Sequence, residues 1–225
     1  MRLARTPGVH LTMVNDGSTD GTLKILSFLQ QQESSKINII DMPRNGGKAE
    51  AVRQGLLHSL NAGAELVGFL DADLSTPVSE AIRLVGELRS RPSVRVVLAS
   101  RVALLGYDIR RHAWRHYLGR VFATVASHVL NLVVYDTQCG AKFFRATPAL
   151  QQALKQPFFS PWIFDVELIS RLLKPSGGDG AYSVKDFLEV PLLFWEDVKG
   201  SKLGLFQMFK SGWDLIILGI RMRLR

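Results

Sequence analysis

The first two-thirds of the sequence alternates short apolar segments with longer segments in which apolar residues recur every three or four positions. Short runs rich in Leu, Ile and Val are typical of strands buried in a sheet. The longer segments predict amphipathic helices. Strand alternating with helix predicts an α/β fold built on a parallel sheet. The predicted strands are 10–14, 37–41, 66–70 and 94–99, and the predicted helices are 22–32, 48–60 and 79–89.

Four polar loops follow these strands, namely "NDGSTDG", "RNGGK", "DAD" and "SR". Ligands of parallel α/β sheets bind beyond the carboxyl ends of the strands, so we expect the four loops to line one crevice. Asp71 and Asp73 follow the most apolar strand, and both can approach one cation if the backbone turns there. A plainer alternative is that the two residues only cap the turn at the following Ser-Thr-Pro.

The other loops carry groups that suit a nucleotide. Asn15 and Asp16 end the first strand, where a carboxylate can accept hydrogen bonds from a base or ribose, or can form a turn. Gly47 and Lys48 open a helix, and a helix N-terminus favours phosphate. The spacing of a Walker loop is absent. Together with Arg101, the loops supply cations for phosphates and carboxylates for a metal.

Composition limits the class of protein. With 225 residues and 47% hydrophobic residues, the chain fits one large globular domain. Its one cysteine, Cys139, excludes an intramolecular disulfide framework and a Cys-rich zinc site. The net charge of +8 predicts an anionic partner: a nucleic acid, a nucleotide or an acidic membrane surface. The tryptophans argue against nucleic acid, because they do not sit in basic stacking clusters.

The motifs together resemble a known family. In order along the chain, "VNDGSTDGT", "RNGGKAEAVRQG", "LDADLSTP", "SR", "DTQCGAKFFR", "WIFDVEL" and "DVKGSKL" are similar to family 2 inverting glycosyltransferases. The similarity runs from about residue 11 to residue 203 and is greatest to the polyprenyl-phosphate branch, in particular to dolichyl-phosphate β-glucosyltransferases. The resemblance implies a GT-A fold, a Rossmann-like and mostly parallel sheet with flanking helices, plus amphipathic helices at a membrane interface.

The resemblance also implies roles for single residues. The carboxylates of Asp71 and Asp73 would bind Mg²⁺ or Mn²⁺ that bridges the donor diphosphate, which agrees with the preference of hard cations for carboxylate and phosphate oxygens. The nucleotide-sugar donor would contact Asn15, Asp16, Gly47, Lys48, Asp71, Asp73 and Arg101. The catalytic group would comprise Asp136, Gln138, Lys142 and Asp165.

Two purely structural alternatives apply to these catalytic residues. "DTQCGAKFF" can be a turn at a strand edge with Cys139 packed as a small hydrophobic residue, and acidic residues commonly lie near a helix N-terminus, as Asp165 does. If the acceptor is a phosphate monoester, its oxygen is already anionic near neutral pH. We therefore expect Asp136 to orient the acceptor rather than deprotonate it.

Two amphipathic segments, 110–134 and 204–225, combine basic, aromatic and apolar residues. Such helices can lie in a membrane interface or can pack against a core. No apolar tract reaches the ~20 residues that cross a bilayer. The interpretation is a peripheral protein on the cytoplasmic face of a bacterial inner membrane or the endoplasmic reticulum. Its lipid-phosphate contacts are predicted to be Arg110, Arg111, Arg115, Lys199, Ser201 and Lys202.

We expect a catalytic domain at 1–203, which includes the 110–134 helix, and a basic C-terminal helix at 204–225. Relatives of this kind begin with a strand and loop like "VVIPAYNE" about thirty residues before "NDGS", whereas this sequence has only residues 1–11 there. The expectation is that this first strand is missing, that neighbouring strands have unpaired edges, and that donor binding is weak.

The predicted function is transfer of a hexose, glucose from UDP-glucose, to a polyprenyl or dolichyl phosphate with inversion and with a divalent metal. One alternative is GDP-mannose as donor. Another is a non-catalytic basic module that binds anionic lipid or nucleic acid. The sequence leaves the oligomeric state open.

Overall fold

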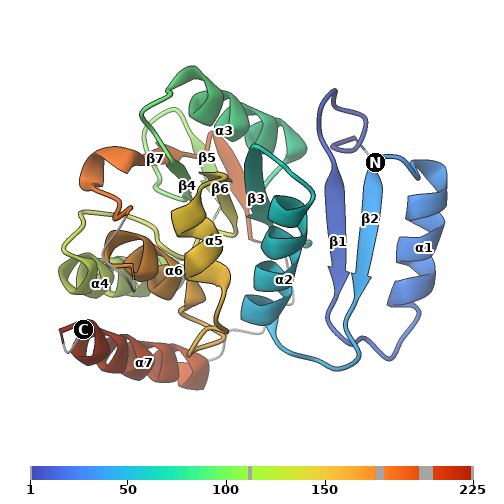
Figure 1. Ribbon diagram of the computed structural model, residues 1–225. Coiled ribbons are helices and arrows are strands. Elements are labelled where there is room, and N and C mark those ends of the chain that lie inside the picture. Colours follow the sequence, from blue (N-terminus) through green and yellow to red (C-terminus); the bar gives the residue numbers. More distant parts are fainter. Residues whose placement is uncertain (1, 111–112, 176–179, 198–204, 224–225) are drawn as a thin grey trace.

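The computed structural model describes residues 2–110, 113–175, 180–197 and 205–223, with side chains from Tyr117 and Lys210 onward in the two helices that follow the gaps at 111–112 and 198–204. Its strands are flanked by helices, which confirms the α/β class (Figure 1). In chain order the elements are β1 (Leu11–Asn15), α1 (Thr22–Gln32), β2 (Ile37–Asp41), α2 (Lys48–Asn61), β3 (Leu66–Leu70), α3 (Val78–Ser90), β4 (Val96–Ser100), β5 (Asp108–Arg110), α4 (Ala113–Leu130), β6 (Ala141–Arg145), α5 (Pro148–Leu154), α6 (Phe164–Leu173), a 3₁₀ turn (Val184–Asp186), β7 (Phe187–Pro191), β8 (Phe194–Glu196) and α7 (Leu205–Arg223).

The strands form three sheets rather than the single parallel sheet that the sequence predicts. β1 and β2 pair in parallel, β5 and β8 pair in parallel, and the central sheet has the order β3-β6-β4-β7. Within it β6 runs antiparallel to both neighbours. The sequence predicts no strand at β6, which runs antiparallel because it starts at the edge where β3 and β4 end. A strand that leaves that edge can only run back across the sheet.

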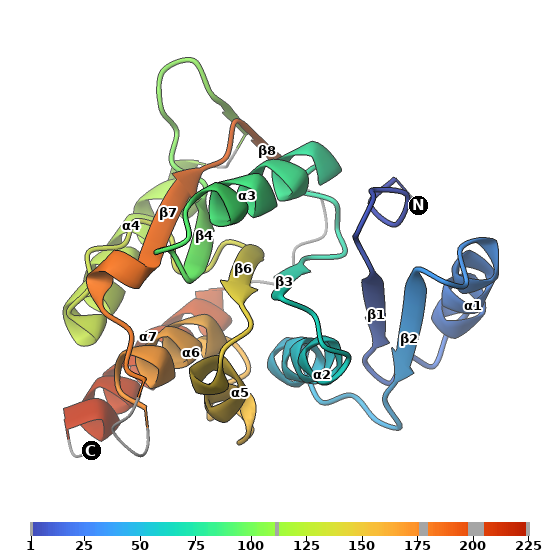
Figure 2. The ribbon, with the colours of Figure 1, turned by 45° about the horizontal axis from the view of Figure 1, so that its top comes forward.

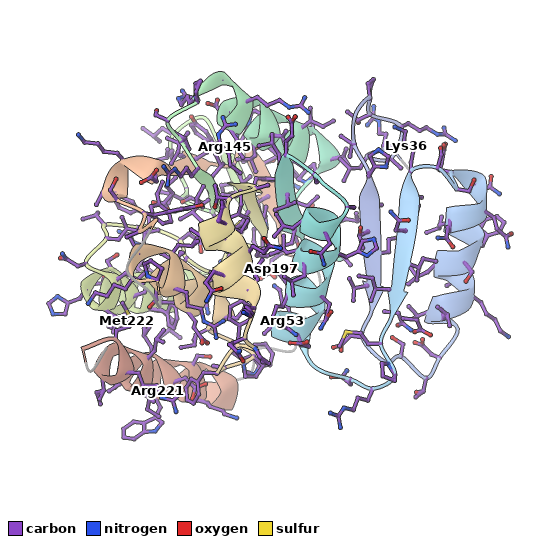
Figure 3. All side chains as sticks on the ribbon, in the orientation of Figure 1. Lys36, Arg53, Arg145, Asp197, Arg221 and Met222 are labelled. Carbon is purple, nitrogen blue, oxygen red and sulfur yellow. The ribbon has the colours of Figure 1, made fainter. Side chains whose placement is uncertain are left out.

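The β1–β2 sheet is separate from the central sheet. In the described part of the chain, β1 pairs only with β2 and β3 pairs only with β6, so each has one open edge. Helix α2 packs against both β1 and β3 and thereby joins the two sheets (Figure 2). Arg53 of α2, labelled in Figure 3, is buried and donates to the Leu154 carbonyl oxygen at 3.0 Å, which holds α2 on α5.

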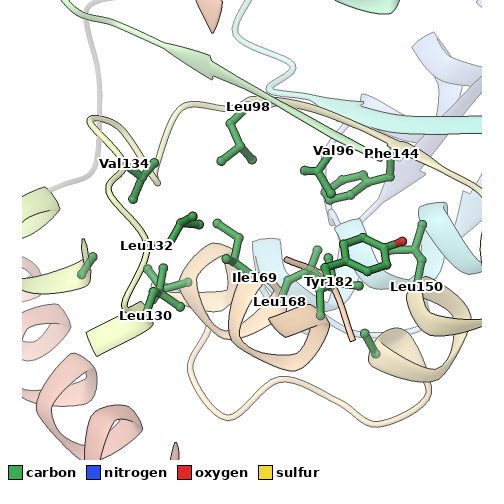
Figure 4. Packing of buried hydrophobic residues seen from close by; sticks show 14 of the residues in the cluster. Val96, Leu98, Leu130, Leu132, Val134, Phe144, Leu150, Leu168, Ile169 and Tyr182 are labelled. Atoms are coloured by element: carbon green, nitrogen blue, oxygen red, sulfur yellow. The ribbon is translucent and has the colours of Figure 1, made fainter. Parts of the chain in front are cut away.

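The core lies on both faces of β4, as the alternation of side chains along a strand requires. Val96 and Leu98 face α4, α5 and α6, where they meet residues such as Ile169 and Leu130 (Figure 4). Val97 and its neighbours on that side pack under α3. Every residue of β4 is buried, so the loop after it starts from a fixed position.

Helices α4 and α7 have two apolar faces each. One face is buried in the core and carries Ala126 and Leu130 on α4 and Leu215 and Leu218 on α7. The core-packing alternative is therefore correct for this face. Other apolar side chains of the same helices are exposed: Tyr117, Val121, Val125, Trp213, Ile216 and Ile220. Among the described helices none is long and apolar enough to cross a membrane.

Candidate active site

The loop after β1 is locked to the loop before α2. The two carboxylate oxygens of Asp16 accept the N–H groups of Gly46 and Gly47 at 2.7 and 3.0 Å. Gly17 has φ of +63°, and a Cβ there would lie 2.4 Å from the backbone of Arg44. The two loops therefore approach so closely that only glycine fits, and Asp16 holds the glycine loop in place.

Asn15 is buried at the end of β1 and also has partners within the protein. Its amide donates to Asp41 Oδ1 at 2.7 Å, and its Oδ1 accepts the N–H of Ser18 at 3.4 Å. Asn15 thus takes part in the local turn through Ser18, whereas Asp16 binds the backbone of a distant loop. Their contact with a nucleoside stays a prediction.

The carboxyl end of β3 places Asp71 beside the helix that Gly47 opens. Lys48 Nζ lies 2.6 Å from Asp71 Oδ1, and both side chains are partly exposed. Asp73 Oδ1 accepts the N–H of Ser75 at 2.9 Å, so Asp73 also caps the turn. Leu74 lies between Asp73 and Ser75 in this turn and has φ of +61°. Such strained non-glycine residues cluster at functional sites.

Asp71 and Asp73 are the carboxylates at this strand end that could hold a divalent ion, with water and phosphate as its other ligands. The described residues hold no cluster of three His, Cys, Asp or Glu side chains that would enclose a metal. Mg²⁺ commonly uses one or two carboxylates together with substrate phosphates. Asp71 already faces a cation, the Lys48 ammonium group. The donor set therefore suits an ion that arrives with a diphosphate.

The loop before β6 closes against Asp71. The N–H of Asp71 donates to the Gly140 carbonyl oxygen at 2.8 Å, and a Cβ on Gly140 would lie 2.0 Å from Asp71 Oδ2. Lys142 and Asp165 form a buried ion pair at 2.6 Å, and Lys142 also donates to the Cys139 carbonyl oxygen at 2.6 Å. The two predicted catalytic residues Lys142 and Asp165 thus lie beneath this loop and support it.

Arg101 and Asp136 form the second charged pair, at the end of β4. The guanidinium donates from Nε to Oδ2 at 2.6 Å and from Nη2 to Oδ1 at 2.8 Å. The backbone N–H groups of Arg101 and Gln138 donate to the same carboxylate. Burial alone would lower the pKa of Arg101, but the Asp136 carboxylate raises it well above its ordinary value. Asp136 is bound by four N–H groups and is a poor general base, which agrees with an orienting role.

A small cavity adjoins this pair. It is lined by Arg101 and by Arg120 of α4, together with Tyr135, Thr137 and Gln138. The Thr137 hydroxyl is buried and has no hydrogen-bond partner among the described residues. The lining carries two guanidinium groups, the Asp136 carboxylate and neutral donors. With one cation in excess, the cavity suits an anion such as a phosphate.

Of the predicted lipid-phosphate residues, the structure describes the side chain of Arg110 alone. Arg110 is exposed and forms a bidentate pair with Asp108 at 2.9 and 3.0 Å. Outside the described residues lie Arg111, Lys199, Ser201, Lys202 and the side chain of Arg115.

Two residues at the site, Arg120 and Glu189, were not predicted from the sequence. Arg120 lines the cavity, although the sequence suggests only a basic residue of an amphipathic segment. Glu189 accepts the N–H groups of Tyr135 and Asp136. Glu189 could have been noticed as the one acidic residue inside the apolar stretch "FLEVP". An acidic residue inside a sheet needs a specific partner.

Comparison with known proteins finds similar sequences among dolichyl-phosphate beta-glucosyltransferases. A dolichyl-phosphate beta-glucosyltransferase of Trichomonas vaginalis is 29% identical over 222 residues, covering 95% of this chain and 60% of that protein. The enzymes of that name from Mus musculus and Saccharomyces cerevisiae are each 28% identical, covering 94% and 93% of this chain and 64% of their own lengths. The chain thus spans about three-fifths of the length of these relatives.

Solved structures share the fold. Glucosyl-3-phosphoglycerate synthase from Mycobacterium tuberculosis, in complex with Mn²⁺, uridine diphosphate and glucosyl-3-phosphoglycerate, superposes with a TM-score of 0.62 at 17% identity, covering 95% of this chain and 68% of that one. Its complex with Mn²⁺ and UDP-glucose gives a TM-score of 0.61 at 15% identity, covering 98% and 81%. This likeness confirms the GT-A architecture. The sequence model of glycosyl transferase family 2 matches residues 3–150, and the chain therefore belongs to that family.

Proposed function

We propose that this protein transfers glucose from UDP-glucose to a polyprenyl or dolichyl phosphate, with inversion at the anomeric carbon. The observation that carries the proposal is the pairing of opposite charges at the ends of β3 and β4. Asp71 and Asp73 can hold a cation, while Lys48 and Arg101 can attract phosphates. The similarity to dolichyl-phosphate beta-glucosyltransferases supports the choice of sugar and acceptor.

On the donor side, the residues that would hold Mg²⁺ or Mn²⁺ are Asp71 and Asp73. When bound, such an ion stabilises the negative charge of the departing diphosphate. Lys48 is paired with Asp71 in this structure and can turn to a diphosphate oxygen when the ion replaces it. Gly140 leaves room for the Asp71 carboxylate to keep this position.

On the acceptor side, the cavity beside Arg101 and Arg120 would receive the phosphate. Its oxygen is already anionic near neutral pH, so it needs no base. That oxygen forms a bond to the anomeric carbon while the bond from this carbon to the diphosphate oxygen breaks, and UDP leaves with the electron pair. Asp136 fixes the Arg101 guanidinium that orients the acceptor.

Docking on a membrane surface would bring a lipid phosphate to the cavity. Helices α4 and α7 contact each other and expose apolar side chains, among them Val121, Trp213 and Ile220. Arg120 and Arg221 lie on the same two helices and can pair with lipid phosphates. We place the protein peripherally at a cytoplasmic membrane face.

The test is incubation with radiolabelled UDP-glucose, polyprenyl phosphate and Mn²⁺. Wild type should give label that extracts into organic solvent, and Asp73→Asn should not. Asparagine can still accept the N–H of Ser75, so the turn is kept while the charge is lost. Asp20→Asn, at an exposed turn before α1 where Asp20 accepts the N–H of Thr22, is the matched control and should remain active. Label from GDP-mannose alone would support the mannosyl alternative, and vesicle binding without any transfer would support a non-catalytic module.

A further inference from the structure

Glu189 on β7 is a partly buried carboxylate that no step of the proposed reaction uses. Its Oε1 accepts the N–H of Asp136 at 2.7 Å and that of Tyr135 at 3.0 Å, and its Oε2 accepts the N–H of Tyr135 at 2.8 Å. Hydrogen bonds from N–H groups to a charged carboxylate are stronger than those to a neutral acceptor. One side chain therefore fixes two consecutive backbone units of the loop between α4 and β6.

The position of Glu189 in the sheet explains its reach. β7 is the edge strand of the central sheet and runs parallel to β4, with Glu189 opposite Leu98. The loop that contains Tyr135 has no ladder partner on this strand among the described residues, so the carboxylate substitutes for backbone pairing. Burial raises the pKa of Glu189, and the N–H groups of Tyr135 and Asp136 offset part of that effect.

Both residues held by Glu189 contact an arginine of the acceptor cavity. The Asp136 carboxylate binds the Arg101 guanidinium in bidentate fashion. The Tyr135 ring lies under the Arg120 guanidinium, at 4.7 Å from ring centroid to Cζ. Arg101 and Arg120 are the two guanidinium groups that line the cavity. Both cationic groups thus depend on the same short stretch of backbone.

We propose that Glu189 is a positioning residue that sets Arg101 and Arg120 for the acceptor phosphate by fixing the backbone of Tyr135 and Asp136. The inference rests on the proposed function, since it assigns the cavity to the acceptor. The proposal also makes a claim about UDP binding that can be tested separately from acceptor binding. The two residues that Glu189 holds contact Arg101 and Arg120, whereas Lys48 and Asp71 pair at the end of β3, so we expect UDP affinity to change much less than acceptor affinity.

The test compares Glu189→Gln with wild type in two binding measurements and one kinetic measurement. Glutamine keeps the size of the side chain but can accept with one oxygen only, and its amide group faces an N–H donor. Citronellyl phosphate, a short soluble prenyl phosphate, serves as acceptor probe in calorimetry with UDP and Mn²⁺ present. We expect its affinity to fall and its KM in transfer to rise by about tenfold or more. UDP affinity should stay within about twofold of wild type.

Glu80→Gln is the matched control. Glu80 of α3 is a buried carboxylate that accepts the backbone N–H of Leu193 at 2.9 Å and pairs with Arg83. It is not among the residues that line the cavity. Glu80→Gln should lower the melting temperature about as much as Glu189→Gln does, and it should leave the affinity for citronellyl phosphate unchanged. Equal losses of acceptor affinity in the two variants would overturn the proposal, because they would show a general effect of stability.

A second variant covers the case in which Glu189→Gln does not fold. Tyr135→Leu removes the ring beside Arg120 at a half-exposed position and leaves the backbone contacts with Glu189 in place. It should weaken citronellyl phosphate binding by about threefold or more, as loss of a cation–π contact implies. Unchanged binding would overturn the proposal. If wild type binds citronellyl phosphate and Glu189→Gln weakens it, yet no sugar is transferred, the proposed function fails and the positioning role stands.

Discussion

Replacement of Lys142 by methionine tests whether the buried pair under the site has the energetic role that its geometry implies. The side chains of Lys142 and Asp165 are 1% and 5% exposed, and their charged atoms lie 2.6 Å apart. Methionine has a similar length and no charge, so the Asp165 carboxylate would remain buried without its partner. Removal of one member of a buried pair costs about 3–5 kcal/mol.

That loss is large for a domain of this size. Native domains are stable by only about 5–15 kcal/mol. A domain of 150–250 residues loses about 2–4 °C in Tm for each kcal/mol, so Lys142→Met should melt about 6–20 °C lower than wild type. The double variant Lys142→Met, Asp165→Leu should recover most of the loss, because an apolar pair of similar volume has no uncompensated charge.

The same pair predicts a pH dependence. Burial raises the pKa of Asp165 above its ordinary value of 3.8, and Lys142 and Lys48 counteract this only in part. The folded protein therefore holds this proton more tightly than the unfolded chain, and this group's contribution to stability falls as pH rises from 3.8 through the raised folded pKa. Removal of Lys142 raises the folded pKa further. The destabilisation of Lys142→Met should thus be greater at pH 8 than at pH 5.

Thermal unfolding followed by circular dichroism at pH 5 and pH 8 measures these effects, with Lys24→Met on the exposed side of α1 as control. The control should melt within about 2 °C of wild type, as expected for a surface change. A Lys142→Met protein that melts like the control, or whose loss is the same at both pH values, would refute the reasoning.

Three further changes test other contacts. Gly140→Ala puts a Cβ 2.0 Å from Asp71 Oδ2 and should reduce Mn²⁺-dependent UDP affinity about tenfold or more in calorimetry; an unchanged affinity would show that Asp71 does not face the donor. Arg101→Lys keeps the charge but loses the bidentate pair with Asp136, so chemical denaturation should show a loss of about 1–3 kcal/mol. A loss within error of zero would contradict this. Trp213→Ser, at a side chain that is 64% exposed, should change stability by less than about 0.5 kcal/mol yet weaken sedimentation with anionic vesicles; full vesicle binding would exclude α7 as a docking surface.

Local periodicity was enough to predict the elements that precede the site. β3 and α2 begin where the sequence indicates. β3 is a short apolar run that ends at Asp71, and α2 has apolar residues at helical spacing after the glycines of its loop. The strand predicted at 94–99 lies at 96–100, a shift typical of element ends. The charged loops after β3 and β4 were predicted as site loops because polar residues directly after a buried strand lie at the edge of the sheet.

Partners distant in sequence could not be predicted in this way. Arg101 and Asp136 are 35 residues apart, and Glu189 lies 53 residues beyond Asp136. Each pair meets only because β6 turns back antiparallel beside β4, and strand direction is a property of the whole sheet. The hydrogen bonds from the N–H groups of Gly46 and Gly47 to Asp16 were likewise not predictable, because they join two loops about 30 residues apart.

Calorimetric titration of UDP with and without Mn²⁺ tests the donor site most directly. If Asp71 and Asp73 hold an ion that bridges the diphosphate, Mn²⁺ should strengthen UDP binding to wild type and to Asp20→Asn by about tenfold or more, and both Asp71→Asn and Asp73→Asn should abolish this gain. UDP binding that is equally tight in the presence of a chelator, or a gain that survives the loss of both carboxylates, would contradict the account.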